Sequence, residues 1–239
     1  FMILVFNHLG FNQDVIVHMA IATGMATILF TTTSAIWAHH KHNSIDWKLV
    51  ASLSPGLVIG SLVGGSEIFE ALNTSWLSLF FALFIIYTSI QMILNKKPSA
   101  GRELPGSVGL FSFGAFAGSL ASLVGAGGAF ITVPFMLWCN VKPHTAMATS
   151  SGLGFPIAAA ATIGYMYGSW GNPNLPAGSL GFVYVPAVAC IVAVSIFTAP
   201  LGAKMARKLN VAQLKRIFGV MLLMLAAFML NESRKAFGF

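Results

Sequence analysis

Residues 143–203 read PHTAMATSSGLGFPIAAAATIGYMYGSWGNPNLPAGSLGFVYVPAVACIVAVSIFTAPLGA and contain no Asp, Glu, Lys or Arg. Three further charge-free runs cover residues 49–66, 71–95 and 104–141. A charge-free apolar run of about 18 residues or more is typical of a transmembrane helix. Outer-membrane barrels instead show short alternating segments. The pattern therefore predicts an all-α membrane protein with several spans.

The overall composition supports the same class. Of 239 residues, 56% are hydrophobic and 8% are charged, whereas an average soluble domain carries about 25% charged residues. This excludes an ordinary soluble globular domain. The formal net charge of +7 could indicate nucleic-acid binding, but the basic residues lie in short loops between apolar runs. That placement favours an orientation signal, and no nucleic-acid partner is expected.

Turn residues and charges divide the chain into a short apolar piece and a series of longer segments. The predicted segments are 1–9, 15–38, 47–66, 74–95, 107–124, 129–139, 144–168, 179–205 and 212–231. The chain starts at Phe1 inside an apolar stretch, which predicts a first helix upstream that is missing from the sequence. The segment at 129–139 is short, because eleven residues at about 1.5 Å each cover roughly 16 Å.

Loop charges predict the direction of the spans. If 129–139 and the preceding turn cross, the basic loops all face the cytoplasm, and of 13 basic residues only Arg234 and Lys235 lie outside. The loops expected in the cytoplasm are 39–48, 96–106, 204–216 and the turn at Lys142. The loops at 67–73 and 169–178 contain no Lys or Arg and are expected outside.

Two stretches of the sequence resemble each other. His18–Gly24 reads HMAIATG and His144–Ser150 reads HTAMATS, yet the loop charges give their spans opposite directions. Asn73, Leu77 and Phe81 likewise match Asn210, Leu214 and Phe218. The sequence predicts two inverted repeats of four to five helical segments, 1–95 and 107–239, joined by a cytoplasmic linker at 96–106. Inverted repeats with broken helices near the midplane are typical of secondary transporters.

The cluster Gly125-Ala-Gly-Gly128 predicts a break within the charge-free run 104–141. Unwound backbone is tolerated in a membrane only where protein buries it or where it lines a wet cavity. A short helix starting at Ala129 would direct its free N–H groups into that space, which favours an anion. The alternative is close helix packing by small residues, which explains Gly114 and Gly118 better than this cluster.

Thr149, Ser150 and Ser151 place three hydroxyls in a row, followed by Gly152, Gly154 and Pro156. This composition predicts a weakened or broken helix whose hydroxyls and N–H groups donate to a ligand. The alternative is hydrogen bonding of the hydroxyls to carbonyls of their own helix. Thr23 and Gly24 occupy the equivalent place in the first repeat.

His18 and His144 each open a span with the shared word, so they either line the substrate path or lie at the membrane interface. His39, His40 and His42 are interpreted as a solvated loop. No Lys, Arg, Asp or Glu lies deep within a predicted span, so an anion would be held by helix ends and hydroxyls. The candidate substrate-binding residues are Gly125, Gly127, Gly128, Ala129, Thr149, Ser150, Ser151, Thr23, Gly24, His18 and His144.

The run GAGGAFITVPF at 125–135, followed by HTAMATSS at 144–151, resembles the sulfite exporter TauE/SafE family. SIFTAPLGA at 195–203 and LKRIF at 214–218 fit the same pattern, whereas the N-terminal half fits more loosely. The resemblance implies a multi-pass carrier of the bacterial inner membrane for small sulfur-containing anions such as sulfite, sulfonates and sulfoacetate. The family's first Gly-rich turn would precede Phe1, so half of the implied site is not visible.

The sequence thus predicts a secondary transporter of a small anion that works by alternating access. Its expected partners are that anion and the lipid bilayer, with a homodimer left open. No catalytic residue, metal or cofactor is expected. The alternatives are a passive anion channel and a membrane-embedded redox enzyme using Cys139 and His144, although no Cys pair or acid–base dyad supports an enzyme.

Overall fold

The computed structural model describes residues 2–41, 44–68 and 103–208, with isolated helical positions between 71 and 90 and between 220 and 227. The elements in the continuous ranges are α1 (Met2–His8), α2 (Ile16–Lys41), α3 (Trp47–Val63), the π-helical turn η1 (Gly64–Ile68), α6 (Ser107–Val124), α7 (Ala129–Trp138), α8 (Pro143–Gly168), β1 (Ser179–Leu180), β2 (Val183–Tyr184) and α9 (Val185–Lys208). The predicted spans at 74–95 and 212–231 lie almost entirely outside the described residues.

Within the described part, four helices are long and apolar enough to cross a membrane, namely Ile16–Trp37, Trp47–Ser66, Ser107–Val124 and Thr145–Gly168. Two shorter apolar helices accompany them, Ala129–Trp138 and Val185–Ser195. The protein is therefore a mostly helical, multi-pass membrane protein, as its composition predicts.

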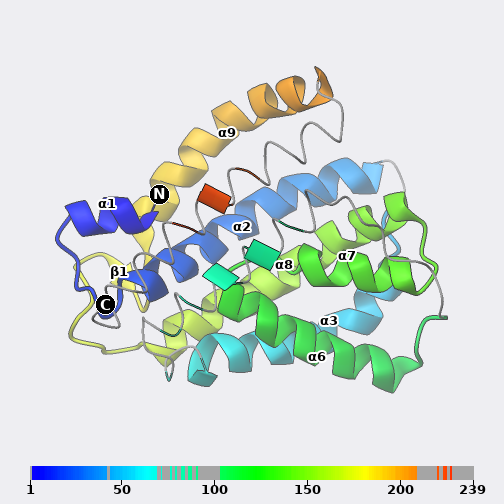
Figure 1. Cartoon of the computed structure of the whole chain (residues 1–239), viewed down its shortest axis with the longest axis horizontal. Helices are drawn as coiled ribbons and strands as arrows, with labels where there is room; N and C mark the ends of the chain where they lie inside the picture. Colours follow the sequence, from blue (N-terminus) through cyan, green and yellow to red (C-terminus); the bar gives the residue numbers. More distant parts are fainter. Residues whose placement is uncertain are drawn as a thin grey trace.

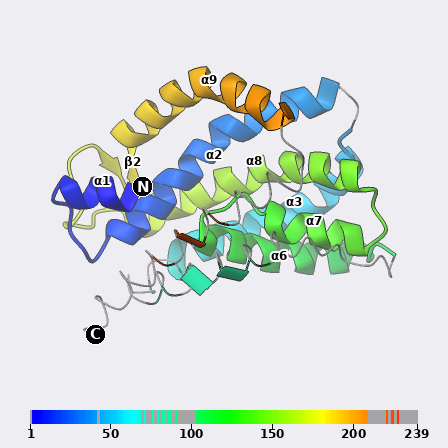
Figure 2. The ribbon, with the colours of Figure 1, turned by 45° about the horizontal axis from the view of Figure 1, so that its top comes forward.

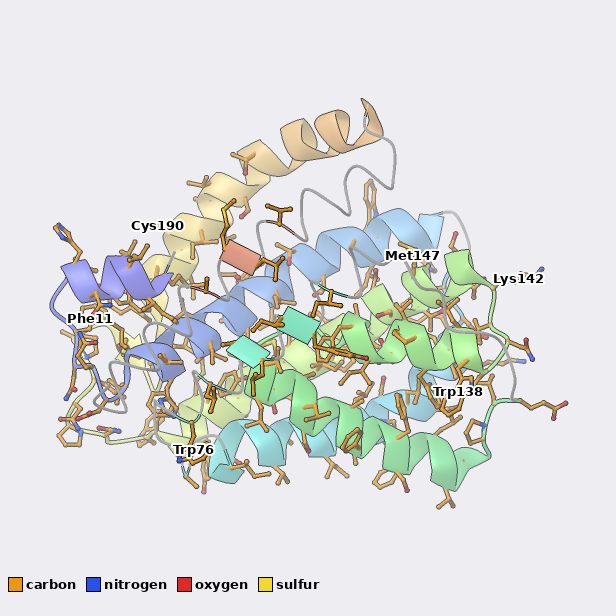
Figure 3. The ribbon with its side chains drawn as sticks, in the orientation of Figure 1. Phe11, Trp76, Trp138, Lys142, Met147 and Cys190 are labelled. Atoms are coloured by element: carbon orange, nitrogen blue, oxygen red, sulfur yellow. The ribbon has the colours of Figure 1, made fainter. Side chains whose placement is uncertain are left out.

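The two longest helices, α2 and α8, each span 26 residues and run antiparallel through the centre of the molecule (Figure 1). α3 and α6 flank them on one side and α9 on the other (Figures 1 and 2). Lys142 lies at one end of the molecule and Phe11 at the opposite end (Figure 3). We call these the basic end, where α3 and α8 begin, and the aromatic end, where the rings of Phe6, Phe11 and Tyr184 pack 5.1–5.7 Å apart.

α6 and α7 form an antiparallel hairpin around the Gly-rich turn. The ring of Phe113, eleven residues before the end of α6, stacks on Phe135, in the second half of α7, with 3.6 Å between centroids. α7 therefore returns toward the end at which α6 begins. This agrees with the direction that the loop charges predict for 129–139. Ten residues cover only about 15 Å, so the turn between α6 and α7 lies deep in the bundle.

Small residues bring α3 and α6 into close contact. A Cβ on Gly56 or Gly60 would overlap the backbone of α6, and one on Gly114 or Gly118 would overlap the backbone of α3. Hydrogen bonds join the same surfaces, because Ser61 Oγ donates to the Gly118 carbonyl at 3.2 Å and Ser119 Oγ to the Gly60 carbonyl at 3.0 Å. The packing interpretation of Gly114 and Gly118 is thus confirmed.

The last described helix starts later than predicted. The segment expected to be helical from 179 instead forms a β-hairpin in which Ser179 pairs with Tyr184 and Leu180 with Val183. Gly178 and Gly181 have φ of 87° and 55°, which favours a turn. α9 then begins at Val185 with Pro186 in its first turn, a position where the missing N–H of proline costs no helix bond.

The prediction of a broken helix after Thr149 is wrong. α8 continues without interruption from Pro143 to Gly168, through Gly152, Gly154 and Pro156. A proline within a buried transmembrane helix is tolerated because neighbouring helices compensate for the lost bond. Gly152 instead faces Val50 and Ile45, and Gly154 faces Thr32. These glycines therefore serve helix packing.

The two ends of the molecule should be separated by the membrane, with the basic end in the cytoplasm. We expect Asn172→Cys to react with a membrane-impermeant maleimide in intact cells, and Lys142→Cys only after permeabilisation. Both variants are made with Cys139 and Cys190 replaced by Ala. Labelling of Lys142→Cys in intact cells would contradict the orientation.

Candidate functional site

The predicted break between residues 124 and 129 is confirmed. α6 ends at Gly125, with φ 68°, and α7 begins after Gly128, with φ 75°. Both values lie in the left-handed region that favours glycine. The Gly128 N–H donates to the Ala126 carbonyl at 2.7 Å. Among the described residues, no acceptor pairs with the N–H groups of Gly127 and Ala129, as expected for the first turn of a helix.

The break lies between α2 and α8, close to the middle of both. A Cβ on Gly127 would lie 3.5 Å from Ile28, near the midpoint of α2, and one on Gly128 would lie 2.6 Å from Ile157 in α8. The Gly127 carbonyl also approaches Gly154 of α8, 3.6 Å from the place of its Cβ. Since both helices are long enough to span a membrane, the free N–H groups lie at mid-depth in the bundle.

The hydroxyls of Thr149, Ser150 and Ser151 point in three different directions, as expected for neighbours on a helix. Thr149 Oγ1 accepts a hydrogen bond from the Asp46 N–H at 3.0 Å. Ser151 Oγ donates to the Met147 carbonyl of its own helix at 3.2 Å. Of the three, Ser150 is the one whose hydroxyl bonds to α7. Its side chain is 2% exposed.

The partner of Ser150 is Thr132, which the sequence analysis did not identify. The two hydroxyl oxygens are 2.8 Å apart, and Thr132 Oγ1 also lies 3.1 Å from the Gly128 carbonyl, to which it donates. Thr132 is fully buried. A signal was present, because Thr132 lies one helical turn after Gly128 and shares the face that opens on the break.

The matching positions of the similar stretch that ends at Gly24 are apolar. Gly24 corresponds to Ser150, and a Cβ there would lie 3.3 Å from the terminal methyl group of Met2. Phe6 corresponds to Thr132 by the same offset and is 1% exposed. Thr32 of α2 also lies beside the break, because a Cβ on Gly154 would meet its methyl group at 3.0 Å and the Gly127 carbonyl at 3.6 Å.

Thr23 and His18 make their described contacts with the segment that precedes α9. Thr23 Oγ1 accepts a hydrogen bond from the Tyr184 N–H at 3.0 Å. The His18 ring stacks on Phe182 with 5.0 Å between centroids. His144 belongs to the first turn of α8, but its side chain is outside the described residues. A role of these three residues and of Thr149 and Ser151 in binding stays a prediction.

Tyr165 of α8 fixes the end of α6 at the break. Its side chain is fully buried, and its hydroxyl donates to the Ser122 carbonyl. The same carbonyl accepts the Gly125 N–H at 3.1 Å, which closes the end of α6. α8 therefore fixes the position of the turn at which α6 ends.

No Asp, Glu, Lys or Arg lies within 15–40, 49–66, 104–141 or 143–203. The charge at the break therefore comes from backbone dipoles, and a helix N-terminus carries about half a positive charge. Cys139 at the end of α7 is buried and Cys190 on α9 is exposed, and neither forms a disulfide within the described residues. Multiple apolar spans around a deep helix break define the protein as a polytopic membrane protein of the transporter type.

The chain belongs to the sulfite exporter TauE/SafE family, whose model matches residues 1–229. It is 30% identical over 215 residues to a probable membrane transporter protein of Haemophilus influenzae, covering 90% of this chain and 81% of that protein. It is 25% identical over 241 residues to the probable membrane transporter protein YunE of Bacillus subtilis, covering 92% and 83%. No solved structure shows a significant match. The protein is therefore a membrane transporter.

Gly127 and Gly128, which directly precede α7, offer a matched pair of variants. Gly128→Ala should lower the midpoint of thermal unfolding by roughly 2–8 °C, because left-handed backbone costs a Cβ about 1–2 kcal/mol and each kcal/mol shifts the midpoint by about 2–4 °C. Gly127→Ala should have little effect, since its Cβ meets only Ile28, at 3.5 Å. Equal midpoints for the two variants in detergent would contradict the described turn.

Proposed function

We propose that the protein is a secondary transporter of a small anion, most consistent with a sulfur oxyanion or organosulfonate, in a bacterial inner membrane. The observation that carries the proposal is the start of α7. The N–H groups of Gly127 and Ala129 lack an acceptor among the described residues, at mid-depth between α2 and α8. Lipid cannot satisfy such groups, whereas an anion can.

In this proposal, the Ser150–Thr132 pair completes the cargo site. Thr132 Oγ1 donates to the Gly128 carbonyl, so the proton between Thr132 and Ser150 is donated by Ser150. When an anion enters, the Ser150 hydroxyl can rotate so that it donates its hydrogen bond to the cargo instead of to Thr132. This rotation costs little free energy. Because the charge-free spans of the described part contain no Lys or Arg, the cargo is held by neutral donors and is released readily.

Alternating access is the proposed mechanism, with the halves 1–95 and 107–239 as inverted repeats. Each half accepts one hydrogen bond from the other, which supports this mechanism. Thr23 of the first half accepts the N–H that precedes α9, and Thr149 of the second half accepts the N–H of the N-cap residue of α3. A passive anion channel is the alternative, and its unitary conductance in planar bilayers would distinguish it from a carrier.

Screening ligands against the purified protein tests the cargo. Sulfite, sulfate, thiosulfate, taurine and sulfoacetate are compared, since a ligand that binds the folded state raises the unfolding midpoint, by about 2.7 kcal/mol of stability at 100 times its Kd. Potassium chloride at equal ionic strength is the control. If none of the five anions exceeds chloride, the proposed cargo class is wrong.

The hydroxyls are tested by neighbouring substitutions. Ser150→Ala should weaken binding of the stabilising anion about ten- to a hundredfold, because a hydrogen bond to a charged group contributes roughly 1.5–3 kcal/mol. Ser151→Ala should cost less, since its hydroxyl already donates to the Met147 carbonyl. Titration calorimetry gives both affinities. A larger loss of affinity for Ser151→Ala than for Ser150→Ala would contradict the proposed site and indicate that the anion binds at the other face of α8.

A further inference from the structure

His18 is a titratable residue inside a helix that can cross a membrane. The four such helices of the described part contain no Asp, Glu or Arg, and their one lysine, Lys48, stands at the very start of α3. The ordinary pKa of histidine, about 6.5, allows proton exchange near neutral pH. The His18 side chain is 4% exposed. An ionisable residue buried within a span marks a candidate functional site.

An aromatic ring lies against the His18 imidazole. The rings of His18 and Phe182 are stacked, with 5.0 Å between centroids and 28° between planes. A cation within about 6 Å of an aromatic ring is attracted to its face, so this contact is compatible with both the neutral and the protonated imidazole. The Phe182 N–H also donates to the Tyr165 carbonyl at 3.5 Å. His18 therefore contacts a residue bonded to the same tyrosine that fixes the end of α6.

His18 is close to the Gly-rich break along α2. Ile21 follows about 4.5 Å further along the helix axis, and its side chain lies 2.6 Å from the place of a Cβ on Gly125. Ile28, about 15 Å along the axis from His18, lies against Gly127. A charge on the imidazole is therefore roughly 12 Å from an anion bound at the break.

The candidate anion site gains a positive charge if His18 is protonated. The charge-free spans of the described part contain no Lys or Arg, and the start of α7 carries only about half a charge. At an effective dielectric constant of about 20, the attraction between two unit charges about 12 Å apart raises affinity about tenfold. The effect is reciprocal, because a bound anion favours the protonated imidazole by the same factor.

The surroundings of His18 act on its charge in opposite senses. Asp14, four residues earlier, is an exposed anion that favours an imidazolium. Burial and the N-terminus of α2 disfavour it. A further negative charge, such as a bound anion, can therefore decide the protonation of His18. The other titratable residues of the elements at this end are His8 of α1, Tyr165 and Tyr167 of α8, and Tyr184 before α9.

We propose that His18 is a proton-binding site coupled to the anion site, so that the cargo binds together with H⁺. One proton from the water at the aromatic end binds a nitrogen of the neutral imidazole when the anion binds, and it is released when the anion leaves. No bond within the cargo changes. The proposal rests on the proposed function, because it requires an anion site at the break.

Titration calorimetry in two buffers counts the protons that accompany the anion. Bis-Tris and imidazole are suitable because they are not anions and differ in their heat of ionisation, whereas sulfonate buffers would compete with the cargo. A tenfold coupling predicts an uptake of up to about half a proton per anion near pH 6.5. Sulfoacetate is the first probe, followed by taurine, sulfate and thiosulfate, because each keeps a constant charge between about pH 5.5 and 8.

Substitutions of His18 test whether it is the residue that takes up the proton. The anion affinity of the parent should fall about tenfold as the pH rises from about 5.5 to 8, because the imidazolium is lost. His18→Phe keeps a ring that can stack on Phe182 but binds no proton, so its affinity should not depend on pH and its proton uptake should be zero. His18→Gln should behave in the same way. His8→Gln is the control, since His8 is exposed at the same end, and it should keep the uptake of the parent.

The outcomes separate the coupling from the anion site. Proton uptake that persists in both His18 variants would assign the proton to another group and overturn the proposal. A purely structural His18 would give this result, with a lower unfolding midpoint and an unchanged dependence of affinity on pH. If an anion binds to the parent without proton uptake, the anion site stands and the coupling is wrong.

The remaining outcomes concern the cargo. If sulfite alone binds, the difference in proton uptake between the parent and His18→Phe decides the proposal, because the proton that sulfite itself exchanges near neutrality is common to both proteins. Equal uptake in the two proteins would overturn the coupling. If none of the five anions binds, the proposed function fails and the coupling fails with it.

Discussion

Every backbone N–H buried in a membrane-spanning segment needs an acceptor from the protein, from water or from a bound ligand, because lipid offers none. Helix starts are where this requirement is hardest to meet. The N–H groups at the start of α3 are satisfied by the Asp46 carboxylate and by Thr149, and Thr23 satisfies the N–H that precedes α9. At the start of α7, the N–H groups of Gly127 and Ala129 have no acceptor among the described residues. The candidate cargo site is formed by these two N–H groups.

Glycine serves two different purposes around that site. Gly60 and Gly118 have helical backbone geometry and allow the backbones of α3 and α6 to come into direct contact, which makes this helix pair rigid. Gly125 and Gly128 adopt positive φ and turn the chain inside the bundle. The α3–α6 pair and the turn are connected, because the Ser122 carbonyl at the end of α6 accepts hydrogen bonds from both the Gly125 N–H and the Tyr165 hydroxyl.

The two similar stretches, HMAIATG at 18–24 and HTAMATS at 144–150, share one contact and differ in others. The threonines at 23 and 149 make equivalent bonds, whereas Thr132 and Ser150 have the apolar counterparts Phe6 and Gly24. Family membership and the similar transporters support transport as the function.

Sequence alone determined the helical membrane class, the bounds of α6 and α7 and the break at Gly125–Gly128, because charge-free length and glycine density are local properties. It did not determine that α8 continues through Pro156, since neighbouring helices decide whether a proline breaks a buried helix. Nor did it identify Thr132 or separate the roles of Thr149, Ser150 and Ser151. Those roles depend on which helix each hydroxyl faces, and only the packing of α3, α7 and α8 fixes that.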